Sequence, residues 1–191
     1  MNKVTENELD TLLRAKNINL DNKDNLYFCA IYHPHEWDGG FESTNGYSGT
    51  KEEFNLDFQY MQNFLYEFIQ YEKVTSAIIA PFYNSGYFED WADIRETDVY
   101  KKIYPILCEH TVTPNSNNGL KLDLISEADY LNIFIEGGFR YLSSICLYIH
   151  ELGILIEPTH NFEYLFYSKN EIEKDIIQIV NSKFQLLKTY H

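Results

Sequence analysis

The chain of 191 residues carries 29 acidic and 15 basic residues, for a formal net charge of -14, and its apolar content is 45%. This acidic balance argues against nucleic acid and anionic membrane as direct partners, because both require a basic footprint. It is compatible with a basic protein as partner, and equally with a charge that only keeps the protein soluble. The length and composition predict a folded globule, with residues 1–191 forming a single domain.

The cysteines and the apolar runs indicate the compartment. Cys29, Cys108 and Cys146 lie far apart and form no C-x-x-C pair, which is typical of a reducing environment. The first residues lack the apolar stretch of a signal peptide, and the apolar region 145–156 is broken by charge and too short to cross a bilayer. We therefore expect a cytoplasmic protein without a membrane partner.

Two elements are predicted before the first long loop. Thr5 is placed to cap a short helix in which the leucines between residues 9 and 13 share one face, with acidic residues in its first turn. The short apolar run 26–32 is bounded by turn residues, which predicts a buried strand. The glycine-rich stretch 33–49 then predicts a long loop.

The longest predicted helix begins after Thr50. Thr50 and Glu53 have the spacing of a capping box, and apolar residues recur on one face up to residue 69, so we predict the central helix here. The β-branched run 74–82 predicts the next strand, which Pro81 confines to an edge or an end. A βαβ crossover is predicted only between residues 26 and 82.

The middle of the chain is less regular. Thr97 or Asp98 caps a predicted short helix through Ile103, which we expect to stop near Pro105. The run Asn-Ser-Asn-Asn-Gly at 115–119 is the clearest break in the sequence, and it predicts a hinge or a boundary between two sub-blocks.

The segment 120–136 leaves two alternatives open. Residues 120–125 predict a strand, but 126–136 fits either state: Ser126 with Asp129 resembles a helix cap, whereas the apolar residues near 133 alternate as in a strand. The pair Gly137-Gly138 is expected to end the element in both cases.

The C-terminal third carries the strongest pattern, and the sheet is predicted around it. Three apolar runs, 144–150, 153–157 and 162–167, are separated by short turns and predict three strands in succession. Ser168 and Glu171 then form a capping-box pair ahead of a predicted amphipathic helix. We therefore predict an α+β fold, with a mainly antiparallel sheet covered by the long central helix and by this C-terminal helix.

The histidines offer the best candidate for metal chemistry. His33 and His35 are two residues apart, so on an extended chain both imidazoles face the same side, and His110, His150 or His160 are available as further ligands. A pair of this kind is more often simply two loop histidines. A small metal-dependent enzyme that uses His33 and His35 is therefore an alternative hypothesis.

No catalytic motif stands out elsewhere in the sequence. The paired glycines lack the spacing of a P-loop or a dinucleotide-binding turn, and His150-Glu151 lacks the second histidine of a zincin. Cys108 has no identifiable base partner, although His110 is close in sequence. We expect a binding protein rather than an enzyme, without a cofactor.

Two irregular stretches combine acidic with aromatic side chains, and both tryptophans of the chain lie in them. Aromatic residues at the centre of a patch with charge at its rim are typical of protein interfaces. Each stretch adjoins the end of a predicted strand, so the two are expected to lie close together. The predicted partner-binding residues are Glu36, Trp37, Asp38, Glu42, Tyr87, Glu89, Asp90, Trp91 and Asp93.

The segment 153–184, with its hairpin, capped helix and acidic character, resembles small bacterial immunity proteins that neutralise a cognate toxin. The resemblance covers about a third of the chain, rests on no diagnostic motif and carries over no functional residue. It implies an immunity or inhibitor protein that blocks a basic partner, a toxin or a nuclease, through an acidic and aromatic surface. A phage-type inhibitor that mimics the charge of DNA is a further alternative, which predicts acids along one ridge.

Overall fold

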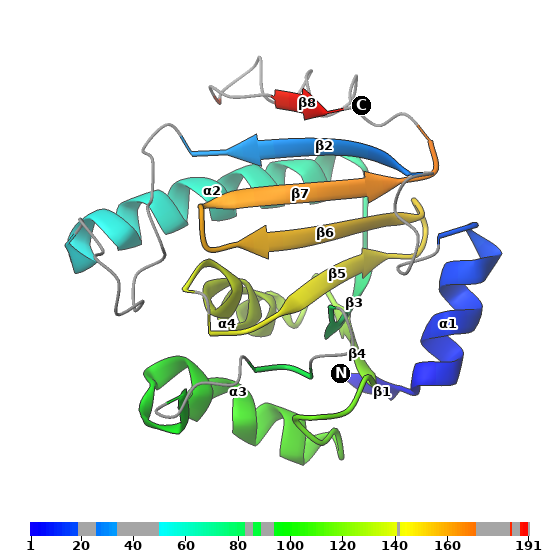
Figure 1. The fold of residues 1–191 in the computed structure, drawn as a ribbon, viewed down its shortest axis with the longest axis horizontal. Helices are drawn as coiled ribbons and strands as arrows, with labels where there is room; N and C mark the ends of the chain where they lie inside the picture. The colour runs from blue at the N-terminus through cyan, green and yellow to red at the C-terminus, as the bar shows by residue number, and fades with distance from the viewer. Residues whose placement is uncertain are drawn as a thin grey trace.

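The described residues form an eight-stranded antiparallel sheet with helices on both faces (Figure 1). The computed structural model describes residues 1–18, 26–33, 50–82, 86–88, 94–140, 142–170, 184 and 188–190. The strand order is β1-β4-β3-β5-β6-β7-β2-β8. The strands are β1 (Asn2–Val4), β2 (Tyr27–Tyr32), β3 (Ser76–Pro81), β4 (Gly119–Asp123), β5 (Ile145–Ile149), β6 (Ile154–Thr159), β7 (Glu163–Ser168) and β8 (Lys188–Tyr190). The helices are α1 (Glu6–Ala15), α2 (Lys51–Tyr71), the short 3-10 helix η2 (Ile94–Glu96), α3 (Asp98–Glu109) and α4 (Ala128–Phe139).

The predicted α+β class, the mainly antiparallel sheet and the long central helix are confirmed. The three successive strands predicted in the C-terminal third are β5, β6 and β7, which pair as an antiparallel meander. The predicted C-terminal helix falls mostly on 171–183, which lie outside the described residues, and Ser168 is the last residue of β7. Strands β1 and β8, three residues each, were not predicted because they are too short to show a period.

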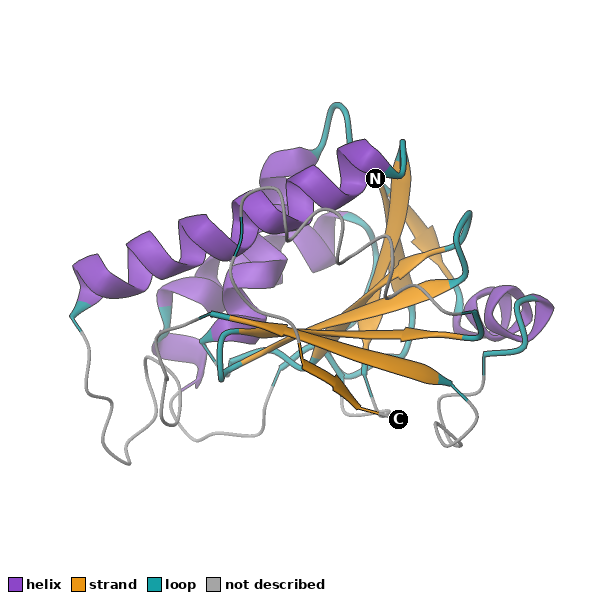
Figure 2. Ribbon diagram, turned by 90° about the horizontal axis from the view of Figure 1, so that it is seen from above, coloured by secondary structure: helices purple, strands orange, loops and turns teal. Residues whose placement is uncertain are grey.

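The crossover predicted over residues 26–82 is present, but three other strands lie between the strands that it joins. Strands β2 and β3 run in the same direction, and β5, β6 and β7 separate them in the sheet. Helix α2 links them across one face of the sheet (Figure 2). The meander is therefore covered by the longest helix of the described chain.

Two capping boxes fix where α1 and α2 begin. The Thr5 side chain accepts from the backbone N–H of Glu8, and the Glu8 carboxylate accepts from the backbone N–H of Thr5 at 2.7 Å. Thr50 and Glu53 repeat the arrangement at the start of α2, at 2.6 Å and 3.2 Å. Each reciprocal pair satisfies two backbone N–H groups that a helix start leaves without partners.

The expected stop of α3 near Pro105 was wrong, because the helix continues to Glu109 with Pro105 inside it. A proline in a helix removes one hydrogen bond and strains the preceding turn. Here Ile106 and Leu107, which follow it, are 7% and 0% exposed, and their burial against the core favours continuing the helix.

The segment 126–136 resolves as helix α4, and Gly137-Gly138 does not end it. A Cβ at Gly137 would lie 2.9 Å from Ser143 Cβ, and a Cβ at Gly138 would lie 2.6 Å from Pro158 Cγ. The glycines are thus positions of close approach, where α4 packs directly onto its neighbours. The close packing of α4 on its neighbours therefore outweighs the tendency of a glycine pair to end a helix.

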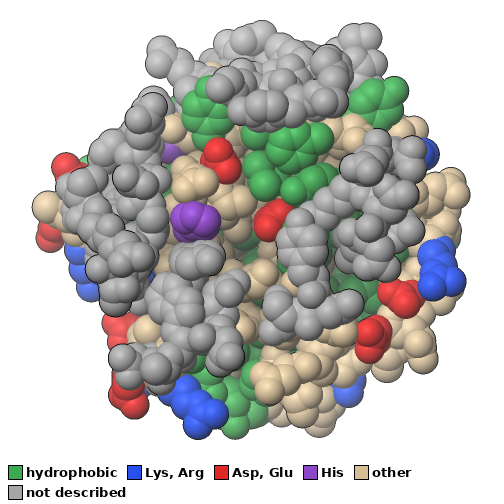
Figure 3. Space-filling view, viewed as in Figure 1, with side chains coloured by type: hydrophobic (Ala, Val, Ile, Leu, Met, Phe, Trp, Pro, Cys, Tyr) green, Lys and Arg blue, Asp and Glu red, His purple; other side chains and the backbone are tan. Residues whose placement is uncertain are grey.

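The two faces of the sheet are packed differently. Helices α2, α3 and α4 cover the first face with one large apolar core, which includes Phe54, Phe139 and Phe166. Helix α1 packs on the second face with a smaller cluster, in which its Leu9 and Leu13 contact the sheet. Figure 3 shows the second face in the orientation of Figure 1, with hydrophobic side chains exposed over β2 and β7.

One row of register partners crosses the second face from strand to strand. Because neighbours in register point to the same side of a sheet, the row is continuous. Its members, from the β1 edge, are Asn2, Lys121, Ile78, Tyr148, Leu155, Tyr167 and Phe28.

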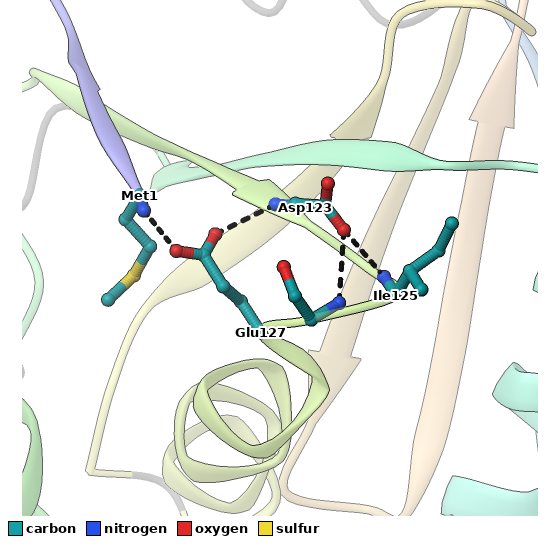
Figure 4. A network of polar contacts seen from close by, with 5 residues as sticks. Met1, Asp123, Ile125 and Glu127 are labelled. Atoms are coloured by element: carbon teal, nitrogen blue, oxygen red, sulfur yellow. Dashed lines mark hydrogen bonds and ion pairs between the residues drawn. The ribbon is translucent and has the colours of Figure 1, made fainter.

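A polar network joins the first residue to the turn between β4 and α4 (Figure 4). The Met1 ammonium contacts Glu127 Oε1, and Glu127 Oε2 accepts from the Asp123 backbone N–H at 2.9 Å. Asp123 Oδ1 accepts from the N–H groups of Ser126 and Ile125, which lowers the pKa of Asp123. Burial opposes ionisation of Glu127, but the ammonium and the N–H group hold its pKa below the ordinary value.

Candidate functional site

Eight of the nine residues predicted to bind a partner lie outside the described residues: Glu36, Trp37, Asp38, Glu42, Glu89, Asp90, Trp91 and Asp93. The ninth, Tyr87, is 0% exposed. Its hydroxyl lies 3.1 Å from the Ile79 carbonyl oxygen and 2.9 Å from the Asn118 carbonyl oxygen, so its single proton is shared between two acceptors. The expectation that Tyr87 faces a partner was wrong, because its hydroxyl finds both acceptors inside the fold.

The residue after Tyr87 does reach a surface of aromatic side chains. Phe88 packs on Tyr100 with ring centroids 4.5 Å apart, and Tyr100 stacks on Tyr104 at 5.2 Å. Tyr104 is 41% exposed. We call Phe88, Tyr100 and Tyr104 the α3 aromatic strip. Its signal in the sequence was the spacing of four between the two tyrosines, which places them on one helical face.

The charges around the α3 aromatic strip are partly paired. Lys101 Nζ lies 3.6 Å from Glu96, and Lys102 Nζ lies 3.2 Å from Glu136. Hydrogen bonding with Cys108 is the main cause that raises the pKa of Tyr104, so this tyrosine stays a neutral hydrogen-bonding group. The strip therefore offers uncharged aromatic surface beside lysines that carboxylates already engage.

The histidine pair proposed for a metal is only half described. His33 Nε2 lies 3.4 Å from Asp57 Oδ1, and its ring meets Tyr60 edge-on at 4.9 Å, whereas His35 is outside the described residues. His110 caps α3, His150 follows β5, and His160 is in the turn after β6. Within the described ranges, no group of three or more histidine, cysteine or carboxylate side chains is arranged to hold a metal ion.

A cleft of about 600 Å³ lies between α1 and the second face of the sheet. Val4, Ile78 and Tyr148 form its buried floor, and Leu12 adds an apolar wall from α1. Ala77 also lines the cleft, and the remaining lining residues are polar: Asn2, Lys3, Asn7, Glu8, Thr11, Ser76, Lys121, His150 and Glu151.

Tyr148 ties α1 to the sheet at one end of this cleft. Its hydroxyl donates to the Leu12 carbonyl at 3.0 Å, and Lys16 N–H donates to Leu13 rather than to Leu12. His150 Nδ1 lies 3.3 Å from the same hydroxyl. The hydroxyl accepts from His150 Nδ1 in the tautomer that carries the ring proton on that nitrogen. Burial, and then the nearby Glu151 carboxylate, raise the pKa of Tyr148 to about 12.

The polar groups of the cleft do not form a nucleophilic triad. Ser76 Oγ donates directly to Glu151 Oε1 at 2.9 Å, while His150 is occupied by Tyr148. In a serine hydrolase the imidazole would stand between the hydroxyl and the carboxylate. Here the hydroxyl contacts the carboxylate directly, without an imidazole between them.

Comparison with known proteins gives no further guide. No protein family, curated protein or solved structure matches this chain. Among the described helices, none combines the length and the apolarity that a bilayer-crossing segment needs.

The cleft was missed at the level of sequence. Its lining comes from α1, β1, β3, β4 and the end of β5, which lie between residues 2 and 151. The pairing of Asn2 with Lys121 brings the two ends of this range together, and it depends on the three-residue strand β1. No local sequence pattern predicts the pairing of strands so far apart in the chain.

Proposed function

We propose that this protein binds a basic protein partner through an acidic and aromatic surface that includes the α3 aromatic strip, as an immunity or inhibitor protein would. The observation that carries the proposal is the exposure of Tyr104, which stacks on Tyr100, while Tyr100 in turn contacts the tilted ring of Phe88. Exposed aromatic side chains beside charge are the residues on which interfaces most often depend.

The distribution of charge supports the same surface. The segment 89–93, which follows Phe88 directly, contains three carboxylates and no cation. All the segments outside the described residues together hold eleven acidic and three basic residues, whereas the described residues hold eighteen and twelve. The acidic excess is thus larger per residue in these segments than in the described residues, and negative charge of this kind would attract a basic partner at long range.

The partner class that fits is a cationic toxin or nuclease, whose substrate-binding surface an acidic protein would cover. The expected compartment is the cytoplasm, where three free cysteines remain reduced. Binding of such a partner requires no chemical step.

The experiment is recovery of the partner from a lysate of the native host, with wild-type chain and two matched variants. Tyr104→Ala removes the exposed end of the strip, and Tyr71→Ala removes a tyrosine of similar exposure, 45%, at the end of α2. We expect one basic protein to be retained at about 0.05 M salt and largely lost at about 0.5 M, because screening shortens the reach of the charges.

The variants then locate the contact. Tyr104→Ala should weaken binding of the recovered partner by about tenfold, and Tyr71→Ala should leave it unchanged. Absence of any stoichiometric basic partner at low salt would refute the proposed function. Equal effects of the two variants would refute the placement on α3.

A further inference from the structure

We infer that the cleft between α1 and the sheet binds a small organic carboxylate with an apolar body. This site is separate from the α3 aromatic strip, so the inference does not rest on the proposed function. All of the residues that line it are described.

The size and floor of the cleft suit a small molecule. Its volume of about 600 Å³ is within the range of roughly 300–1,000 Å³ that ligand pockets occupy. Val4, Ile78 and Tyr148 are each at most 9% exposed and form an apolar base, with Leu12 beside them. The apolar part of a ligand placed here would cover the side chains of Ile78 and Tyr148 where α1 does not cover them.

The charged groups of the lining point to an anion. Lys3 Nζ donates to the Thr111 carbonyl, and the Glu8 carboxylate is held in the capping box of α1. Glu151 accepts from Ser76. Lys121, in contrast, is exposed and has no hydrogen-bond or ion-pair partner among the described residues. Glu8 and Glu151 keep their negative charge but are hydrogen-bonded to neutral donors, whereas the Lys121 ammonium is left for a ligand.

The neighbours of Lys121 supply further hydrogen-bond donors. Asn2 is its register partner on β1, so the two side chains start about 5 Å apart on the same face. Asn7 faces the cleft from α1 and brings a second amide. A carboxylate accepts several hydrogen bonds at once, so one ammonium and two amides match its two oxygens.

The probe that tests this is a series with one body and three head groups: 4-phenylbutyrate, 4-phenylbutanol and 4-phenylbutylamine. Each is titrated into the full isotope-labelled chain, and backbone amide shifts are followed by NMR. We expect saturable shifts at Leu12, Ile78 and Lys121. The carboxylate should bind about fivefold more tightly than the alcohol, and the amine least tightly.

Two variants separate the charge from the cavity. Lys121→Gln should lower the affinity for 4-phenylbutyrate to that for 4-phenylbutanol. Lys51→Gln, which removes an exposed lysine at the start of α2, is the control and should leave the affinities for both compounds unchanged. Thr11→Trp, at an exposed position of α1 that lines the cleft, should fill the space and abolish binding of both 4-phenylbutyrate and 4-phenylbutanol.

The inference is overturned if none of the three probes saturates, or if the shifts lie away from the cleft. It is also overturned if Lys121→Gln binds 4-phenylbutyrate as tightly as the wild type does. Tighter binding of the amine than of the carboxylate would reverse the assigned charge and overturn it as well.

Discussion

The two faces of one sheet are covered in different ways. The first face carries three helices and a dry core with many rings, whose phenylalanines are all 0% or 1% exposed: Phe54, Phe64, Phe68, Phe134, Phe139, Phe162 and Phe166. The second face carries the ten-residue helix α1, smaller side chains such as Ala80 and Cys146, and polar ties through Tyr148. The larger buried core thus lies on one face, from which we expect most of the stability, and the cleft lies on the other.

The largest effect is expected from Phe139→Ala. Phe139 stacks on Phe162 at 4.9 Å and contacts Tyr164 at 5.1 Å, so its removal opens a cavity among rings that cannot collapse together. We expect a loss of about 3–5 kcal/mol in the free energy of unfolding, measured by denaturant titration. Leu13→Ala, on the second face, is the control and should cost less. An equal or greater cost there would remove the distinction between the faces.

Gly138→Ala should also destabilise, against the rule for helices. Alanine in place of glycine usually stabilises a helix by about 1 kcal/mol. Here the new Cβ would lie 2.8 Å from the Pro158 carbonyl oxygen as well as 2.6 Å from its Cγ. We expect a net loss of about 1–3 kcal/mol by thermal or denaturant unfolding.

Pro158→Ala provides the check on that mechanism. Because it removes the Cγ atom, the double variant Gly138→Ala with Pro158→Ala should recover part of the loss. Strictly additive losses in the double variant would show that the close approach of α4 to β6 is not the cause.

A smaller effect is expected from Tyr148→Phe, which removes the hydroxyl that joins α1 to the sheet. The loss should be about 1 kcal/mol, and amide hydrogen exchange should quicken in α1 while α2 keeps its protection. Tyr87→Phe is the counterpart on the first face, where the hydroxyl reaches Ile79 and Asn118. It should leave exchange in α1 unchanged. Unaltered α1 exchange in Tyr148→Phe would contradict the proposed tie.

The smallest effect concerns pH. The pKa values of Asp123 and Glu127 are lower in the folded chain than their ordinary values, so these carboxylates contribute stability above the unfolded pKa, near pH 4. That contribution is lost as the pH falls through the folded pKa values. Unfolding at pH 6 and at pH 3 should show a smaller difference in Asp123→Asn than in wild type. Asp10→Asn, which removes an equal charge from α1, should keep the full difference, and a flattened profile there would contradict the assignment.

Local signals in the sequence predicted the parts of the fold whose causes are local. The caps at Thr5 and Thr50 depend on contacts three residues apart, and the meander depends on short turns between apolar runs. The helix ends predicted at Pro105 and at Gly137-Gly138 were wrong, because tertiary packing outweighed the local preferences of proline and glycine there.

The candidate sites were harder to predict because their residues converge only in three dimensions. Tyr87 looks like a loop residue in sequence, yet acceptors on β3 and before β4 draw it into the core. Lys121 looks like an ordinary solvent-facing strand residue in sequence, and only the structure places Asn2 beside it and both at the edge of a cleft with α1. The acidic aromatic surface stays a prediction, since eight of its nine residues lie outside the described ranges.

The position of β2 beyond the meander has a consequence for biosynthesis. Its partners among the described strands are β7, from Glu163 to Ser168, and β8, from Lys188 to Tyr190. While the ribosome is still translating the preceding residues, β2 has neither neighbour and its edges stay open. Such long sequence separation slows folding and prolongs exposure to aggregation. We therefore expect a nascent chain that stays sensitive to proteases until residues 163–190 have been translated.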